Sequence, residues 1–402
     1  MSFQFLKTGD QRLRSERSEP TIEITEHQLL TESRHNSTAA EAGVPAASKS
    51  GRRMVHQFSP LNDTRWDPFL ARHVRASLFH SSPWLRALNQ TYGYPVVGYT
   101  TSAPGEELKD AVVFCRVESW LTGRRLVSLP FSDHCEPLVD RQEDLQVLIA
   151  SLEEKTWREK WNYMEMRPLT PITVATPLRA TTHYTFHELD LQGDLGTIFR
   201  NLHKDSIQRK IRRAEREKLS YEEGSTKPLL EDFYRLVELT RRRHRLPPQP
   251  KKWFQNLMRC FGEALKIRIA RKDGLAVAAM LTVRHKDALI YKYGGSDAGY
   301  NKLGGMHLLY WAAIRDAKAM GLKTFDLGRT DADQLGLITF KGRWGAKESL
   351  LTYSRYAPAG DSSHMFDVSH SKASSGPARD LLGYLPNRLV SFLGRALYKH
   401  VG

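Results

Sequence analysis

The chain has 402 residues, which is room for two domains, and its 8 Trp, 15 Tyr and 16 Phe exclude a wholly disordered protein. The longest uncharged apolar run, residues 275–283, is much shorter than the roughly 20 residues of a membrane-spanning helix, and the polar N-terminal residues do not resemble a secretory signal. Three cysteines without metal or disulfide spacing predict a reducing, cytoplasmic setting with no metal site, and the net charge of +15 favours anionic partners.

The first 53 residues are small and polar, without an apolar period, and we expect a disordered tail there. The first half, residues 54–180, follows with three strand-like runs, a helix with apolar residues at helical spacing, and a closing strand. We expect these elements at residues 95–100, 111–117, 124–130, 141–160 and 163–168.

The second half, residues 181–356, repeats this order. A strand that ends in an Asp-Gly turn begins a three-stranded meander, and a glycine pair at 294–295 is expected to end it. We expect the elements of this half at residues 266–274, 277–283, 288–293, 305–320, 324–327, 335–342 and 349–356. Aligned at an offset of 162 residues, the two halves indicate an internal duplication and an α/β fold in two similar domains.

Positive charge is concentrated in the linker between the halves. Residues 195–260 hold 17 Lys and Arg against 8 Asp and Glu, an excess of nine. We expect a helix that starts near Leu195 and continues through four arginines on one face. Such a row either binds an anion or is a solvated surface, and the sequence leaves both readings open. The four residues are Arg209, Arg212, Arg213 and Arg216.

Two motifs in the second half indicate chemistry. The glycine pair Gly304 and Gly305 opens a predicted helix, where free backbone N–H groups and the helix dipole favour a phosphate or carboxylate. Further on, GLITFKGRWGA places Lys341 beside Phe340. A lysine held near a reacting carbonyl stabilises the oxyanion of acyl transfer, whereas most lysines are ordinary surface residues.

These residues carry a resemblance. The strings KDSIQRKIRRAEREKL, YKYGGSD, TFDLGR and GLITFKGRWGA resemble the acyltransferase domain of the FemAB-like branch of the GNAT superfamily. In the first half, SSPWLRALNQTYGYP and LPFSDHCEPLV are similar to the degenerate N-terminal GNAT unit of FemAB-like proteins associated with exopolysaccharide systems. The resemblance covers residues 55–356, about three quarters of the chain.

The resemblance implies two tandem GNAT-like domains, each with a mixed central sheet, and transfer of an acyl or aminoacyl group to an amine or hydroxyl. It implies acyl-CoA or aminoacyl-tRNA as the donor and an envelope or exopolysaccharide precursor, carried on a nucleotide or lipid, as the acceptor. The GNAT pyrophosphate loop reads Q/R-x-x-G-x-G/A, whereas residues 301–306, NKLGGM, keep only the middle glycine.

Site residues are expected in three groups. Lys341 would stabilise the oxyanion, and Asp326 would accept a proton from the attacking amine or pair with Arg329, which is the reading we favour slightly. We expect donor-binding by Gly304, Gly305, Tyr293 and Phe340. We expect acceptor or phosphate binding by Arg209, Arg213, Arg329, Asp133 and His134.

The C-terminal residues 357–402 form an extension with apolar and basic residues at helical spacing. They are either a peripheral anchor on an anionic membrane or a helix that closes the fold, and closure is the simpler reading. Two other functions remain open for the whole chain: a nucleic-acid-binding protein without catalysis, which the arginine face suggests, and a non-catalytic scaffold in a polysaccharide machine.

Overall fold

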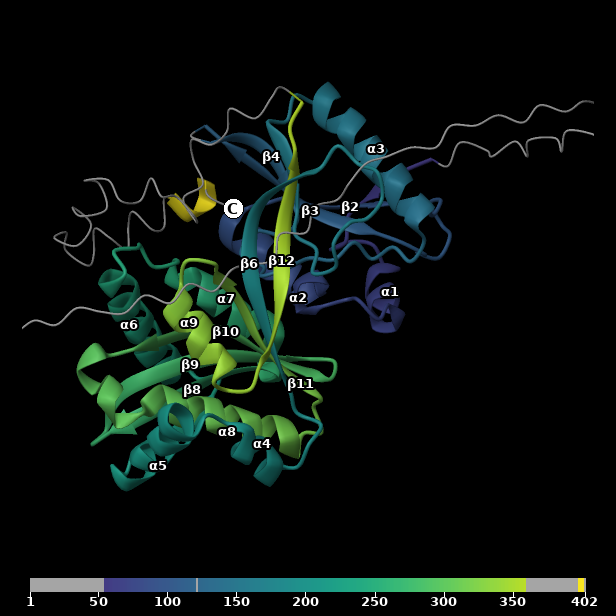
Figure 1. Cartoon of the computed structure of the whole chain (residues 1–402). Helices are drawn as coiled ribbons and strands as arrows, with labels where there is room; N and C mark the ends of the chain where they lie inside the picture. Colours follow the sequence, from purple (N-terminus) through teal and green to yellow (C-terminus); the bar gives the residue numbers. More distant parts are fainter. Residues whose placement is uncertain (1–53, 121, 359–396, 401–402) are drawn as a thin grey trace, which may run out of the picture. The chain divides into compact units, whose positions relative to one another are not determined.

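A computed structural model describes residues 54–120, 122–358 and 397–400 (Figure 1). In this part of the chain, twelve strands form one continuous sheet in the order β1-β2-β3-β4-β5-β12-β6-β11-β10-β9-β8-β7. The strands are β1 His56–Phe58, β2 Val96–Thr100, β3 Val112–Ser119, β4 Gly123–Val127, β5 Tyr163–Met166, β6 Arg179–Asp190, β7 Ser220–Gly224, β8 Leu265–Lys272, β9 Leu275–His285, β10 Ala288–Ser296, β11 Thr324–Asp331 and β12 Lys347–Tyr356.

The order of the sheet shows how the duplicated halves join. Each half has an antiparallel meander, a helix, and a strand parallel to the end of the meander: β2-β3-β4 with β5, and β8-β9-β10 with β11. The last strands are exchanged, because β6 follows β5 in sequence but pairs with β11, while β12 follows β11 but pairs with β5. We call β1–β5 with β12 the first lobe and β7–β11 with β6 the second lobe. The domain boundary near residue 180 stays a prediction.

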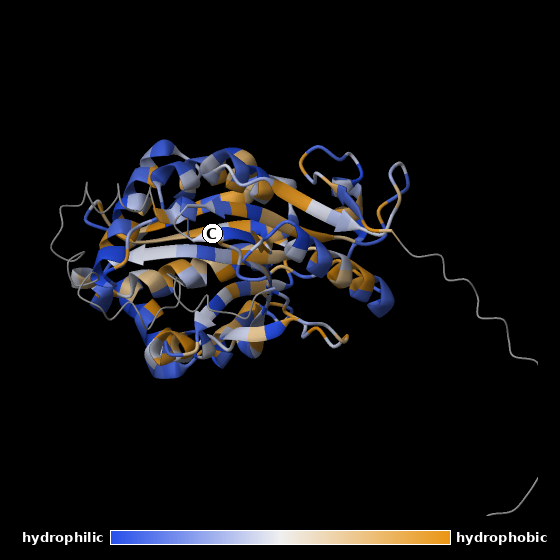
Figure 2. Ribbon diagram, turned by 90° about the horizontal axis from the view of Figure 1, so that it is seen from above, coloured by the Kyte–Doolittle hydropathy of each residue, from blue (hydrophilic) through white to orange (hydrophobic). Residues whose placement is uncertain are grey.

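Helices cover both faces of the sheet. Hydrophobic residues of α1, α2, α6 and α7 share one cluster, α3 covers the other face of the first lobe, and α4, α5 and α8 cover the other face of the second. Hydrophobic residues gather along the strands between these layers (Figure 2). The helices are α1 Trp66–Arg72, α2 Ser82–Tyr92, α3 Gln142–Arg158, α4 Leu195–Asn201, α5 Arg209–Arg216, α6 Lys227–Arg243, α7 Lys251–Phe261, α8 Gly305–Ala319 and α9 Leu335–Gly342.

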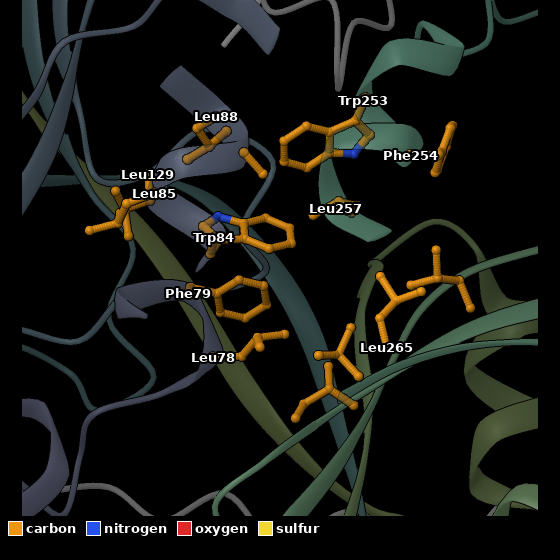
Figure 3. Packing of buried hydrophobic residues seen from close by; sticks show 14 of the residues in the cluster. Leu78, Phe79, Trp84, Leu85, Leu88, Leu129, Trp253, Phe254, Leu257 and Leu265 are labelled. Carbon is orange, nitrogen blue, oxygen red and sulfur yellow. The ribbon is translucent and has the colours of Figure 1, made fainter. Parts of the chain in front are cut away.

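The two lobes share a hydrophobic core between α2 and α7. Trp84 of the first lobe meets Trp253 of the second edge-on, with ring centroids 5.2 Å apart, and both indoles are fully buried. Phe79 packs edge-on against Trp84 at 5.0 Å, on the side away from α7 (Figure 3). Burying aromatic side chains of this size contributes several kcal/mol. This shared core fixes one lobe against the other.

The short described C-terminal segment also contacts both lobes. The Tyr94 hydroxyl of the first lobe donates to the Tyr398 carbonyl at 3.0 Å, and the Tyr398 hydroxyl donates to the Pro247 carbonyl at 3.1 Å, between α6 and α7. The remainder of the predicted amphipathic segment, and the predicted N-terminal tail, lie outside the described residues.

Two local expectations are wrong. The expected continuous helix from Leu195 is broken at Leu202, which is extended, and at His203, and a π-helical turn at Lys204–Gln208 precedes α5. The break arises because the His203 N–H donates to the Arg343 carbonyl at 2.9 Å while the Leu202 side chain is buried.

The glycine pair does not end the meander either, since β10 continues to Ser296. A Cβ on Gly295 would lie 2.6 Å from the Leu236 backbone of α6, so this glycine lets the helix pack closely on the strand.

Candidate active site

The candidate active site lies where β10 and β11 cease to pair. The two strands run parallel through three residue pairs, the last of which joins Ile290 to Asp326. Just beyond this pair, β10 bulges between Tyr291 and Tyr293, and β11 bulges between Asp326 and Gly328. Bulges re-aim side chains and end pairing, so the two strands form a fork.

Asp326 and Lys341 are both buried at the fork. The Asp326 Oδ1 accepts a hydrogen bond of 2.6 Å from the Gly328 N–H. The Lys341 Nζ donates to the carbonyls of Gly328 at 2.9 Å and Arg329 at 3.1 Å. An ammonium carries three donors, so these two bonds leave one for a reacting oxygen.

The loop between β4 and α3 of the first lobe brings Asp133 and His134 to the fork. The Lys292 Nζ of β10 donates to Asp133 Oδ1 at 2.9 Å, and the Arg329 Nε lies 3.9 Å from the same oxygen. His134 Nε2 lies 4.0 Å from Asp326 Oδ2, which is too long for a direct hydrogen bond. Arg329 therefore lies against Asp133, and the slightly favoured pairing of Asp326 with Arg329 is not the contact that the structure shows.

The loop that carries Asp133 and His134 is held in place by β12, one of the two exchanged strands. The Tyr353 hydroxyl of β12 donates to the Asp133 carbonyl at 2.7 Å. The Arg329 guanidinium stacks on the ring of Tyr184 in β6 at 4.1 Å and lies 5.2 Å from the Tyr353 ring. Strand exchange thus places side chains of both lobes around one charged cluster.

Burial shifts the pKa values of Asp326 and Lys341 toward neutral pH. Burial raises the pKa of Asp326 to about 7, and the charge of Asp133 adds to the rise. Burial lowers the pKa of Lys341 to about 8, against the attraction of Asp133 and Asp326. A carboxyl and an amine that both titrate near neutral pH are suited to proton transfer.

The neighbouring groups differ in charge. Burial alone would raise the pKa of Asp133, but Lys292 and Arg329 bring it below its ordinary value, so this carboxylate is ionised. Burial lowers the pKa of His134 to about 4, so the imidazole is neutral near pH 7. Asp133 is therefore a fixed negative charge beside Asp326.

The two predicted donor-binding glycines are packed against protein. A Cβ on Gly304, whose φ is +86°, would lie 2.5 Å from the Lys210 carbonyl of α5, and a Cβ on Gly305 would lie 3.0 Å from Ala278 of β9. The space that these glycines leave is filled by α5 and β9. At these two positions the lack of a side chain serves the close packing of α8 against α5 and β9.

The other predicted residues lie in three different places. Tyr293 accepts a 2.8 Å hydrogen bond from the Trp253 indole in the core between the lobes, behind Lys292. Phe340 and Arg209 line a pocket of about 550 Å³ on the other side of α9, whereas Arg213 pairs with Glu217 at 3.4 Å along α5. The arginines of α5 and Arg329 therefore do not belong to one phosphate site.

Lys292 was missed by the sequence reasoning, although its side chain is 5% exposed and bonds Asp133. It lies 5.1 Å from the ring centroid of Phe79 and 5.6 Å from that of Trp84. Its position between two tyrosines in YKYGG, on a strand with a buried face, is a signal that could have identified it.

The described residues contain no group of three His, Cys, Asp or Glu side chains that could hold a metal ion. Among the same residues, no helix is both long and apolar enough to cross a bilayer.

Residues 202–341, which belong mostly to the second lobe, match the family model of the acetyltransferase (GNAT) domain. The chain carries a GNAT domain. The GNAT domain expected in the second half is confirmed, and the FemX structure has the fold that the resemblance to FemAB-like proteins implied. No curated protein matches the sequence.

Solved structures show the fold over most of the chain. The crystal structure of FemX is 14% identical, with a TM-score of 0.58, and the match covers 75% of this chain and 97% of FemX. A tandem GNAT protein from the clavulanic acid biosynthesis pathway is 10% identical, with a TM-score of 0.49, over 76% of this chain and 98% of that protein. At 14% identity, the likeness to FemX concerns the fold alone.

Proposed function

We propose that the protein is an acyltransferase of the GNAT superfamily that moves an acyl or aminoacyl group to an amine or hydroxyl. The observation that carries this proposal is the buried pair of Asp326 and Lys341 at the fork, with pKa values near 7 and 8. Both groups change charge near neutral pH, which suits a base and an acid of one reaction.

Asp326 is the general base of this mechanism. The acceptor's amine or hydroxyl attacks the acyl carbon and forms the new bond, while Asp326 takes the proton of the attacking group. The electron pair of the acyl carbonyl moves to its oxygen, and the remaining N–H of Lys341 stabilises that oxyanion. When the tetrahedral intermediate collapses, the bond to the carrier breaks and the carrier leaves with a proton.

Asp133, Lys292 and Arg329 set the electrostatics of this centre. The Asp133 carboxylate keeps the pKa of Asp326 high, while Lys292 and Arg329 keep Asp133 ionised. Because this cluster joins both lobes, the acceptor is expected to bind where they meet, beside Asp133 and His134.

The finer identity of the substrates rests on the sequence resemblance. We propose an envelope or exopolysaccharide precursor, linked to a nucleotide or lipid, as the acceptor, and acyl-CoA or aminoacyl-tRNA as the donor. We also propose a cytoplasmic location, with peripheral membrane contact through the C-terminal extension. LPFSDHCEPLV, one of the strings that carries the resemblance, is the loop that delivers Asp133 and His134 to the fork.

The test is a transfer assay with labelled acetyl-CoA and labelled aminoacyl-tRNA against a panel of amino-sugar and hydroxyl acceptors. Lys341→Ala should lower kcat about 10²-fold or more, because one oxyanion donor is lost. Lys347→Ala, an exposed lysine on β12, is the matched control and should stay within about twofold. Transfer by the Lys341→Ala variant at the wild-type rate would refute the role of Lys341. Absence of transfer from every donor, with RNA binding retained, would favour the non-catalytic alternative.

A further inference from the structure

Two of the eight tryptophans are largely exposed, and both lie at one end of the first lobe. Trp120, in the turn between β3 and β4, is 87% exposed, and Trp157, in the last turn of α3, is 69% exposed. Five of the other six have exposed fractions of 4% or less, and Trp311 is partly buried. An indole has a large apolar surface that is seldom left in water, so two exposed indoles at one end of a lobe indicate a contact surface.

The β3–β4 turn and the end of α3 meet at the same edge of the sheet. β4 runs parallel to β5, so the turn that precedes β4 and the helix end that precedes β5 lie side by side. The Arg124 N–H donates to Asn162 Oδ1 at 2.9 Å, and the Arg124 guanidinium donates to the Glu159 carbonyl at 2.8 Å. These bonds join the residues that follow Trp120 to the residues that follow Trp157, and the two indoles therefore belong to one surface.

The β3–β4 turn is held in shape by hydrogen bonds of its own and by the C-terminal segment. The Thr122 N–H donates to Ser119 Oγ at 3.0 Å, and the Thr122 hydroxyl donates to the His400 carbonyl at 2.7 Å. The His400 Nδ1 lies 2.9 Å from the same Ser119 Oγ. The turn is thus tied to the protein through its backbone and small side chains, while the Trp120 indole stays in solvent.

The C-terminal extension leaves the sheet and returns to it at this same end. β12 ends at Tyr356, which is paired with Met164 at the start of β5 and packs against the α3 side of the first lobe (Figure 1). Residues 397–400 then contact the β3–β4 turn. The sequence between these two points combines apolar and basic residues, and both of its ends are attached beside the exposed tryptophans.

Positive charge surrounds the two exposed indoles. The exposed charged residues near them in the described part of the chain are four cations, Arg124, Arg158, Lys160 and Lys399, and two acids, Glu118 and Glu154. We call these six residues, with Trp120 and Trp157, the tryptophan surface. The Arg124–Glu118 and Arg158–Glu154 pairs are 3.6 and 3.8 Å long between side chains at least 47% exposed, so solvent screens them. Four cations against two acids leave an excess of two positive charges, which attracts an anionic partner.

We infer that the tryptophan surface docks on an anionic lipid bilayer, with Trp120 and Trp157 entering the head-group region. Indole rings favour the membrane–water interface, because it accommodates both their apolar body and their polar N–H. Arginine and lysine side chains beside them meet the anionic head groups. The inference rests on the proposed peripheral membrane contact in one respect, since it names the folded surface that makes this contact.

Flotation of the full-length protein with vesicles tests this inference. Vesicles of phosphatidylcholine are compared with vesicles of an equal mixture of phosphatidylcholine and phosphatidylglycerol, and the protein should bind the anionic mixture more tightly. Trp120→Ala and Trp157→Ala should each weaken this binding about tenfold, because each removes one indole from the interface. Arg158→Gln should weaken it about fivefold at low salt and much less at high salt.

Two matched controls lie on the second lobe. Leu275→Ala changes an exposed apolar residue at the β8–β9 turn, and Arg216→Gln changes an exposed arginine of α5. Each should alter vesicle binding less than about twofold. Vesicles with bromine-labelled lipid chains should quench tryptophan fluorescence in the wild type and not in the double variant Trp120→Ala/Trp157→Ala. Thermal unfolding of each variant verifies that the fold is retained.

Equal vesicle binding by the wild type and the double variant would overturn the inference and leave the C-terminal extension as the contact. Failure of the wild type to bind anionic vesicles at low salt would also overturn it, and the tryptophan surface would then belong to a protein partner. The proposed acyl transfer is tested separately. The double variant should transfer to a water-soluble acceptor at the wild-type rate, whereas Lys341→Ala should lose transfer and still bind vesicles.

Discussion

Each lobe buries a carboxylate where its two parallel strands end, but the two carboxylates are treated differently. In the first lobe, Glu165 of β5 accepts from Arg167 at 2.7 Å and from Arg355 at 2.6 Å. Burial alone would raise the pKa of Glu165, yet the two arginines lower it to about 2. In the second lobe, burial beside Asp133 raises the pKa of Asp326 to about 7. Glu165 is kept ionised by two arginines and has a structural role, whereas the raised pKa of Asp326 is typical of the reactive site that we propose.

The two lobes also differ at the ends of their parallel strands, because β4 and β5 of the first lobe do not end in an open fork. The Cys135 N–H donates to the Arg167 carbonyl at 2.7 Å, so the loop after β4 closes over the end of β5. The same loop carries Asp133 and His134 into the second lobe's fork. The first lobe therefore supports the fork of the second lobe, where we propose that the chemistry takes place.

The largest effect is expected from Glu165→Gln. The change leaves two guanidinium groups facing a neutral amide, and breaking a buried ion pair in this way costs about 3–5 kcal/mol. The folded pKa of Glu165 is depressed, so its contribution is present above the unfolded pKa and is lost as the pH falls from about 4.5 to about 2. Chemical denaturation at pH 7 and pH 3 measures both. A kcat that falls more than about fivefold in the folded variant would contradict a purely structural role.

Asp326→Asn should lower kcat/KM by about 10²-fold, because the amide cannot accept a proton. In the wild type, kcat/KM should rise with pH through about 7 as Asp326 ionises and fall above about 8 as Lys341 loses its proton. The pH–rate profile measures both limbs. A profile that is flat between pH 6 and 9 would show that neither group acts in the rate-limiting step.

The same Asp326→Asn variant should be more stable than the wild type at pH 8 by about 4 kcal/mol, because the pKa of the carboxyl differs by about three units between the folded and unfolded states and each unit is worth about 1.4 kcal/mol. The folded carboxyl keeps its proton up to about pH 7, whereas the unfolded one loses it near its ordinary value of 3.8. The wild type therefore loses stability as the pH rises from about 4 to about 7, and the amide does not. Equal stability differences at pH 4 and pH 8 would mean that the carboxyl is not strained in the fold.

The sequence predicted the regular elements best, because their signals are local. The helix after Gly304 and the meander after Gly262 follow from periodicity and turn residues, and the structure places them within a few residues of the expected bounds. Lys341 was a catalytic candidate from the family resemblance, and Asp326 was one from the chemistry of aspartate on a strand, but the sequence did not predict that the two lie at one fork.

What the sequence did not predict depends on contacts between distant residues. The alternation of Tyr184 and Phe186 indicates a strand, but it does not say which strands β6 and β12 pair with. The exchange of these two strands is therefore visible only in the structure. Lys292 is recognised as a site residue through its hydrogen bond to Asp133, which is 159 residues away in the chain. The break at Leu202 depends on the Arg343 carbonyl, which periodicity within the segment could not reveal.

The smallest effect is expected for the stability of two glycine variants, which test how tightly the start of α8 packs. Gly304→Ala should destabilise the protein by about 1–3 kcal/mol more than Gly321→Ala, because both positions have positive φ but only the first meets another atom, the Lys210 carbonyl. Thermal unfolding of the two variants gives the difference. Two equal losses would show that the α5 contact is not tight.

The central claim is that Asp326 is a buried, uncompensated carboxyl with a pKa near neutrality. Carbon-13 NMR of the protein with labelled aspartate side chains, titrated from pH 4 to 9 and assigned with Asp326→Asn, measures this directly. We predict that the Asp326 carboxyl titrates near pH 7, while the pKa of Asp133 lies below its ordinary value because of Lys292 and Arg329. A midpoint for Asp326 below about 5, in the range of an ordinary aspartate, would contradict the account.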